Sequence, residues 1–383
     1  MVSQSTGGRS AGKPLRYPVL DSLRGLAAVG VVFHHIPAVA GISAAGFDAN
    51  FGRMVDLFFV LSGFVIAASY GKKLSSGFSF SRFIWLRWGR VWPLHAAMLT
   101  VFALSMLALG LMRPELRTYG FMAGRNDPAD LPIAFLLLQG IVPSLGPTWN
   151  HPSWSVSVEM LLYIVAALSW RTLRGRAWMP WLVLATALLT FMAVGPGFDG
   201  LASNIARGLA GFGLGLTLHR VMERSGPPAL GTGLATILEL AAFAALGAVL
   251  WGSGSIAAFD LAATALVALA ALQQGLISRL LCAAPFQWLG AMSYVLYIVH
   301  VFVIGRVFDL LAVLQPRFGI LIADTVVGGQ DALVGPGLQA DMMKLLIMVL
   351  CLIVSVPFAR LIEQPARAWS RRVAGQPMPR PAN

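Results

Sequence analysis

The sequence places a cation and an imidazole inside an apolar stretch. Residues 20–35 read LDSLRGLAAVGVVFHH, so Arg24 and His35 are eleven positions apart. On an α-helix, eleven residues advance about 1100°, roughly 20° past three full turns, and rise about 16 Å. Arg24 and His35 therefore share one helix face at two depths, whereas His34 lies about 80° from Arg24 and is expected to pack. Histidine is the side chain most often used as a general base, so His35 is the first catalytic candidate.

Two carboxylates in other apolar stretches could assist this imidazole. Asp56 occurs in GRMVDLFFVLSGF and Glu159 in NHPSWSVSVEMLLYI, both at positions that we place in the outer half with His35. We expect Asp56 to lie beside His35, where it would hold the tautomer and stabilise the imidazolium, and Glu159 to orient an acceptor hydroxyl or pair with His35. Structural hydrogen bonds between helices are the alternative for both. Ionisable groups inside membrane spans are costly, which makes them functional candidates.

Two further ionisable residues are weaker candidates. His300, in GAMSYVLYIVH, has no carboxylate in its own segment. Glu363, in LIEQPAR, lies beside Arg360 and Arg367, where ion pairing is the simplest role.

A basic stretch provides a different chemistry. RFIWLRWGRVWPLH contains Arg82, Arg87 and Arg90, and the last two are three positions apart on one helix face. Guanidinium groups bind phosphate in a bidentate way, so this pair suits the phosphates of a nucleotide-like ligand. The same pattern also fits a cytoplasmic loop that contacts anionic lipid.

Composition identifies the class of protein. Of the 383 residues, 57% are hydrophobic and 11% charged, which indicates a polytopic membrane protein. The net charge of +12 comes from short basic clusters between apolar runs, as in cytoplasmic loops, and this argues against a nucleic-acid partner. Neither of the two cysteines has metal-ligand spacing, so we expect no disulfide framework and no metal.

The hydrophobic pattern predicts an all-α bundle of about ten transmembrane helices. A shorter run, 131–146, is broken by Pro and Gly. If it does not cross, the basic loops and both termini share the cytoplasmic side, so we expect a re-entrant or interfacial segment. We expect residues 1–18 to be a disordered cytoplasmic N-terminus, 19–365 the transmembrane domain and 366–383 a basic cytoplasmic tail. The predicted spans lie near 20–42, 51–70, 93–112, 154–171, 177–195, 203–219, 233–252, 256–274, 288–312 and 341–361.

Six motifs, in this order, give the chain a resemblance to a known family. They are LDSLRGLAAVGVVFHH, VDLFFVLSGF, RWGRVWP, WSVSVE, LGAMSYVLYIVH and IEQP, and they cover roughly residues 20–365. The chain resembles the membrane acyltransferase family 3, the bacterial integral-membrane O-acyltransferases of surface polysaccharides.

The resemblance implies an activity and a site. It implies transfer of an acyl group, usually acetyl, from cytoplasmic acyl-CoA to a hydroxyl of a surface or exported glycan, by a multi-pass protein of the bacterial inner membrane. His35 would be the essential imidazole and Arg24 its motif partner. Arg87 and Arg90 would serve the CoA end, without a metal. Asp56 and Glu159 match the intramembrane carboxylates of the family.

Some larger family members carry a fused extracytoplasmic domain after the last span. We expect no such domain in this protein, and we therefore expect the membrane domain to complete the transfer itself or with a separate extracytoplasmic partner.

From the predicted depths we expect CoA to dock its phosphates on Arg87, Arg90 and Arg24 and to extend its thioester to His35. His35 would be a general base, and an acyl-histidine relay is the alternative. Two further readings stay open: an acyltransferase with a small-molecule or lipid acceptor, and a transporter or flippase, because buried charges in a bundle are also typical of transporters.

Overall fold

The computed structural model describes residues 17–112, 126–142, 148–194, 200–252, 254–318, 323–326 and 330–375. Helices dominate this part of the chain, which confirms the predicted all-α class. A two-stranded antiparallel hairpin joins β1 (Ala323–Val326) to β2 (Gln330–Leu333), and the sequence analysis did not predict it. The helices are α1 (Pro18–His35), α2 (Met54–Ile66), α3 (Lys72–Ser75), α4 (Phe80–Met112), α6 (Leu131–Phe135), α7 (Trp154–Leu173), α8 (Trp178–Val194), α9 (Gly200–Ser225), α10 (Thr232–Trp251), α11 (Ile256–Leu272), α12 (Leu276–Leu281), α13 (Ala284–Phe318), α14 (Gly337–Phe358) and α15 (Gln364–Val373).

Each of the ten predicted spans overlaps one of these helices, although 20–42 extends past the end of α1 at His35 and residue 195 lies outside the described residues. Within the described residues, six helical runs are long and apolar enough to cross a membrane, and two more, Trp178–Ala193 and Ile256–Leu272, are apolar but shorter. The chain is therefore a multi-pass membrane protein, and the number of ten spans stays a prediction. The six runs are Phe51–Ser75, Phe80–Met112, His151–Leu173, Thr232–Trp251, Ala284–Arg317 and Gly337–Val373.

The broken segment 131–146 contains the five-residue helix α6 followed by a turn, as far as residue 142. Five helical residues are far fewer than the ~20 that a span needs. This geometry fits the predicted non-crossing segment.

Two pairs of helices approach closely at glycines. A Cβ on Gly25 of α1 would lie 2.7 Å from the backbone nitrogen of Gly290 in α13, so the two backbones are in contact. A Cβ on Gly63 of α2 or on Gly215 of α9 would likewise collide with backbone of the opposite helix. In a membrane, small residues permit this approach, and the dispersion contacts that result hold helices together. These crossings fix α1 against α13 and α2 against α9.

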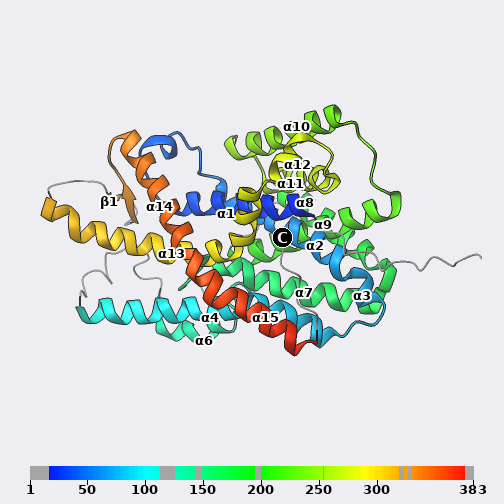
Figure 1. Cartoon of the computed structure of the whole chain (residues 1–383), viewed down its shortest axis with the longest axis horizontal. Coiled ribbons are helices and arrows are strands. Elements are labelled where there is room, and N and C mark those ends of the chain that lie inside the picture. Colours follow the sequence, from blue (N-terminus) through cyan, green and yellow to red (C-terminus); the bar gives the residue numbers. More distant parts are fainter. Residues whose placement is uncertain are drawn as a thin grey trace, which may run out of the picture.

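The bundle has two distinct ends along its long axis (Figure 1). The β-hairpin lies at one end, and α3 and the last turns of α15 lie at the other. The end of α1 joins the hairpin, because the Val39 amide donates to the Leu333 carbonyl (3.0 Å) and the Leu333 amide to the Pro37 carbonyl (3.0 Å). At the opposite end, Lys72 pairs with Glu223 (2.8 Å). We call these the hairpin end and the basic end.

The predicted basic clusters meet at the basic end. One cavity there is lined by Lys72 of α3, Arg220 of α9 and Arg174 of the turn that follows α7. A second cavity is lined by Arg87 together with Arg371 of α15. Their shared location is what the loop-charge argument requires.

The C-terminal stretch is more ordered than the sequence suggested. Residues 366–373 of the predicted tail belong to α15, which has Pro365 in its first turn, where no backbone N–H donor is needed. The Trp85 indole donates to the Ser370 carbonyl (3.2 Å) and packs edge-on against Trp369. The polar composition did not predict this helix, because the helix is stabilised by the packing of one of its faces against α4. Residues 1–16 and 376–383 of the predicted termini lie outside the described residues.

The crossing of α1 and α13 leads to a stability prediction. Gly25→Ala should destabilise the fold by about 1–3 kcal/mol, because the added methyl overlaps the α13 backbone. Gly247→Ala is the matched control, since Gly247 lies inside α10 and a Cβ there has no atom within 4 Å. The midpoint of thermal unfolding in detergent measures both effects. Equal midpoints for the two variants would contradict the close crossing.

Candidate active site

A narrow cavity of about 80 Å³ opens among α1, α2, α4, α7 and α13. It brings together four predicted site residues from three helices: Arg24, Arg87, Arg90 and Glu159. We call it the inner cavity, because Arg87 and Arg90 also line the cavity at the basic end that Arg371 lines. Its other polar residues are Ser62, Ser155, Tyr163, Ser293, Tyr294 and Tyr297.

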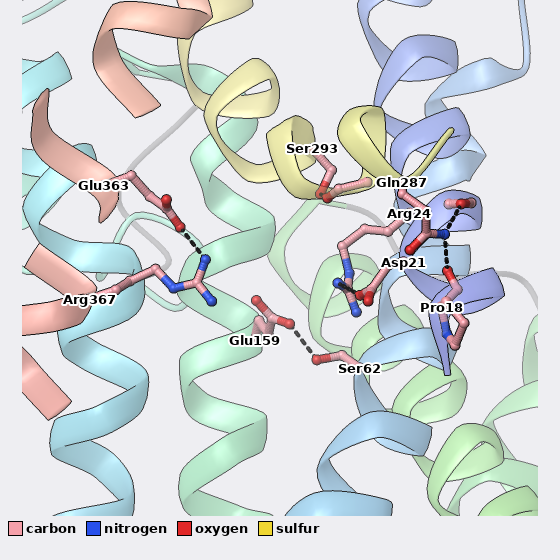
Figure 2. Close-up of polar contacts among 11 residues, drawn as sticks. Pro18, Asp21, Arg24, Ser62, Glu159, Gln287, Ser293, Glu363 and Arg367 are labelled. Carbon is pink, nitrogen blue, oxygen red and sulfur yellow. Dashed lines mark hydrogen bonds and ion pairs between the residues drawn. The ribbon is translucent and has the colours of Figure 1, made fainter. Parts of the chain in front are cut away.

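Glu159 lies in this inner cavity and not beside His35. Its carboxylate accepts hydrogen bonds from the Ser62 hydroxyl and from the Tyr163 hydroxyl (2.6 Å), and Figure 2 shows it facing Ser62 across the gap between two helices. The prediction that Glu159 shares the outer layer with His35 is corrected by this placement. The cause is the helical periodicity of α7: Glu159 and Tyr163 are one turn apart on the face that meets α2.

Arg24 is held by its own helix. Its guanidinium forms an ion pair with Asp21 at 3.0 Å, one turn earlier in α1, and Figure 2 shows the two side chains folded together. The side chain still lines the inner cavity. Arg24 therefore adds positive charge to the same cavity as Arg87 and Arg90, as the sequence predicted.

A wider cavity of about 310 Å³ surrounds His35 and is called the outer cavity here. Tyr297 lines both cavities, and its hydroxyl lies 2.7 Å from the Ser155 hydroxyl and donates to the Pro152 carbonyl (2.8 Å). Tyr297 is therefore a wall that the two cavities share. The remaining polar lining of the outer cavity comprises His34, Asn50, Arg53, His151, Trp154 and Arg207.

The hydrogen bonds of His35 define its tautomer. Its Nδ1 lies 2.9 Å from the Val31 carbonyl oxygen and 3.3 Å from Nε2 of His300. Nδ1 of His300 lies 3.2 Å from the Leu296 carbonyl oxygen. A carbonyl only accepts, so both histidines carry their proton on Nδ1, and the unprotonated Nε2 of His300 accepts from His35. His35 is then left with a basic Nε2, which is the form that a general base needs.

Asp56 does not have the predicted partner. Its two oxygens accept from Nε and Nη2 of Arg207, both at 2.9 Å, in a bidentate ion pair, and its side chain is fully buried. The sequence analysis matched Asp56 to His35 by depth alone, but the side chain faces α9 instead of α1. Arg207 lines the outer cavity and stacks on Trp154, so Asp56 acts on this cavity through Arg207.

Four residues of the outer cavity region were missed or ranked low. His300 was ranked low because it has no carboxylate in its segment, yet its partner is His35 from another helix. Arg207 was overlooked, although a cation inside the apolar run of α9 is itself a signal. His151 brings its ring to 5.9 Å from that of His35, and His34, expected to pack elsewhere, lines the same cavity.

The loop between α1 and α2 forms one wall of the outer cavity and is anchored to α14. The ammonium group of Lys344 donates to the Ser43 hydroxyl (2.7 Å) and pairs with Asp48, and both charged side chains are buried. The Asp48 carbonyl oxygen lies 3.1 Å from Nδ1 of His34. Removal of one partner from a buried ion pair strongly destabilises a protein. The pair of Lys344 and Asp48 therefore holds this wall in place.

Metal ligation has no candidate in the described part of the chain. Its His, Cys, Asp and Glu side chains form no group of three that could hold a metal ion.

Two adjacent cavities in a helical membrane bundle, one rich in arginine and one rich in histidine, define a membrane protein with a buried binding site. A family model described as an acyltransferase domain matches residues 17–363, so the chain belongs to acyltransferase family 3.

Curated relatives agree with this membership. The chain is 33% identical over 171 residues to "Protein 2 in picA locus" of Rhizobium radiobacter, covering 41% of this chain and 84% of that protein. It is 31% identical over 176 residues to "Acyltransferase MdmB" of Streptomyces mycarofaciens, covering 42% of this chain and 41% of that relative. No solved structure matches. The protein is thus a transferase that acts on acyl groups.

The ion pair of Asp56 leads to a second prediction. Asp56→Asn should destabilise the protein by about 3–5 kcal/mol, because Arg207 is left buried without its counter-charge. Asp260→Asn is the matched control: both Asp260 oxygens are buried and lack a hydrogen-bond partner among the described residues, so the amide should cost little. Unfolding in detergent compares the two. A larger loss for Asp260→Asn would refute the assignment of Asp56 as the partner of Arg207.

Proposed function

We propose that this protein is an O-acetyltransferase that moves an acetyl group from cytoplasmic acetyl-CoA to a hydroxyl of a surface or exported glycan. The observation that carries the proposal is that the arginine-lined inner cavity and the His35 cavity lie side by side, with Tyr297 as their shared wall. A donor held at the basic end can present its thioester to an acceptor held at the hairpin end. We place the protein in the bacterial inner membrane with the basic end in the cytoplasm.

The donor would enter through the basic end. Arg87 and Arg90 would bind the CoA phosphates, with Arg24 adding charge, because guanidinium matches phosphate geometry. The pantetheine arm would then lie along the inner cavity, which at about 80 Å³ suits an extended chain better than a bulky group. Glu159 would fix the Ser62 and Tyr163 hydroxyls along that path.

The transfer step would use His35 as a general base. Nε2 of His35 takes the proton of the acceptor hydroxyl as its oxygen attacks the thioester carbonyl carbon. The carbon–sulfur bond then breaks, and the imidazolium returns the proton to the CoA thiolate. The Val31 carbonyl and His300 keep the Nδ1 proton in place, and Arg207 would stabilise the negative charge on the carbonyl oxygen.

Removal of the base is the direct test of this mechanism. His35→Ala should lower the rate of acetyl-CoA-dependent glycan acetylation by about 10²–10⁴-fold, the usual contribution of a general base. CoA release by purified protein and mass spectrometry of the glycan measure it. His219 lies outside both cavities, so the His219→Gln control should keep the wild-type rate. A folded His35→Ala protein with normal activity would eliminate the mechanism.

The donor site makes a separate prediction. Arg87→Ala should weaken acetyl-CoA binding by about tenfold or more, because a charge-assisted contact to phosphate is lost. Arg82→Ala is the control on the same helix, since Arg82 stacks on Phe78 and lines neither cavity. Equilibrium binding to protein in nanodiscs distinguishes the two. Equal affinities would remove Arg87 from the donor site.

A further inference from the structure

The small cavity at the basic end that Arg87 and Arg371 line adjoins the inner cavity. We call it the α15 cavity. Arg87 and Arg90 line both the inner cavity and the α15 cavity, and α15 contributes Arg367 and Arg371 to the α15 cavity. Tyr70, Leu86 and Ser370 complete its lining. Four guanidinium groups from two helices therefore surround one space.

Carboxylates neutralise the charges around this space only in part, with Glu159 and Glu363 attracting Arg90. Arg367 is paired with Glu363 at 2.9 Å, as Figure 2 shows. Within the described part of the chain, Arg87, Arg90 and Arg371 form no ion pair, and Nε of Arg87 is buried without a partner. Like charges at this spacing repel in a medium of low dielectric constant. An anion with several negative groups would remove the repulsion.

Specific packing brings α15 to this position. A Cβ on Gly89 of α4 would collide with the Ser370 side chain, so only a glycine lets α15 come this close. The Trp85 indole donates to the Ser370 carbonyl at 3.2 Å, which fixes the residue next to Arg371. Residues 364–373 lie beyond the matched range of the family model, which ends at residue 363.

We infer that α15 completes a phosphate site for the nucleotide end of the donor, an inference that rests on the proposed function. Arg87 and Arg90, which also line the inner cavity, receive the diphosphate that adjoins the pantetheine arm. Arg367 and Arg371 line only the α15 cavity. They receive the phosphate farthest from the thioester, the ribose 3′-phosphate. The site then selects intact CoA over donors without that phosphate.

Arg371 and its neighbour Arg372 form a matched pair for the test. Both lie in the last turn of α15, where a cation interacts favourably with the helix dipole, but Arg372 is exposed and does not line the cavity. Binding of CoA and of dephospho-CoA, which lacks the 3′-phosphate, is measured by calorimetry on the full chain in nanodiscs. The proteins are wild type, Arg371→Gln and Arg372→Gln.

The expected result is specific to one ligand and one variant. Wild type binds CoA about tenfold more tightly than dephospho-CoA, because a charge-assisted contact is involved. Arg371→Gln abolishes that difference and leaves dephospho-CoA binding unchanged, which also shows that the variant is folded. Arg372→Gln behaves as wild type.

Other results overturn the inference in distinguishable ways. If wild type binds CoA but Arg371→Gln binds it equally well, or both variants lose affinity equally, the role of α15 is wrong while the CoA donor stands. If wild type binds neither ligand, the donor of the proposed function fails and this inference fails with it.

Discussion

The contact between α1 and α13 is the constraint on which the site depends. His35 and His300 lie in different helices, 265 positions apart in the sequence, and their ring nitrogens are 3.3 Å apart. That distance requires the two backbones to touch near Gly25 and Gly290, since any side chain at these positions would separate the helices. The same crossing holds Arg24 in the inner cavity at one depth and His35 in the outer cavity at another. The glycine contact thus sets the distance between the two imidazoles, whereas the Val31 carbonyl sets the tautomer of His35 and the rise of α1 sets its distance from Arg24.

The distribution of charged residues along the bundle matches the division into an inner and an outer cavity. At the basic end, guanidinium groups outnumber the carboxylates that face them. Toward the hairpin end, the buried charges occur mainly as pairs: Arg207 with Asp56, and Lys344 with Asp48. Unpaired buried charge is costly. Its concentration at one end is therefore itself an indication that an anionic ligand binds there.

The sequence predicted what depends on local spacing. The helical class follows from composition, the common face of Arg24 and His35 from helix geometry, and the grouping of Arg24, Arg87 and Arg90 from their depth. It could not predict partners across helices, because these depend on how each helix is rotated about its axis. Asp56 and Glu159 were placed by depth alone, and their partners proved to be Arg207, Ser62 and Tyr163. His300 was ranked low for the same reason, since its partner comes from another helix.

The run from Gly337 to Val373 joins two regions of the site. It passes from α14 through a π-helical turn at Ala359–Glu363 into α15 without an intervening loop. Lys344, near one end of this run, anchors the wall of the outer cavity. Arg371, near the other end, lines the α15 cavity. The lysine that anchors the wall of the outer cavity and the arginine that would bind the donor phosphate thus belong to one continuous helical run.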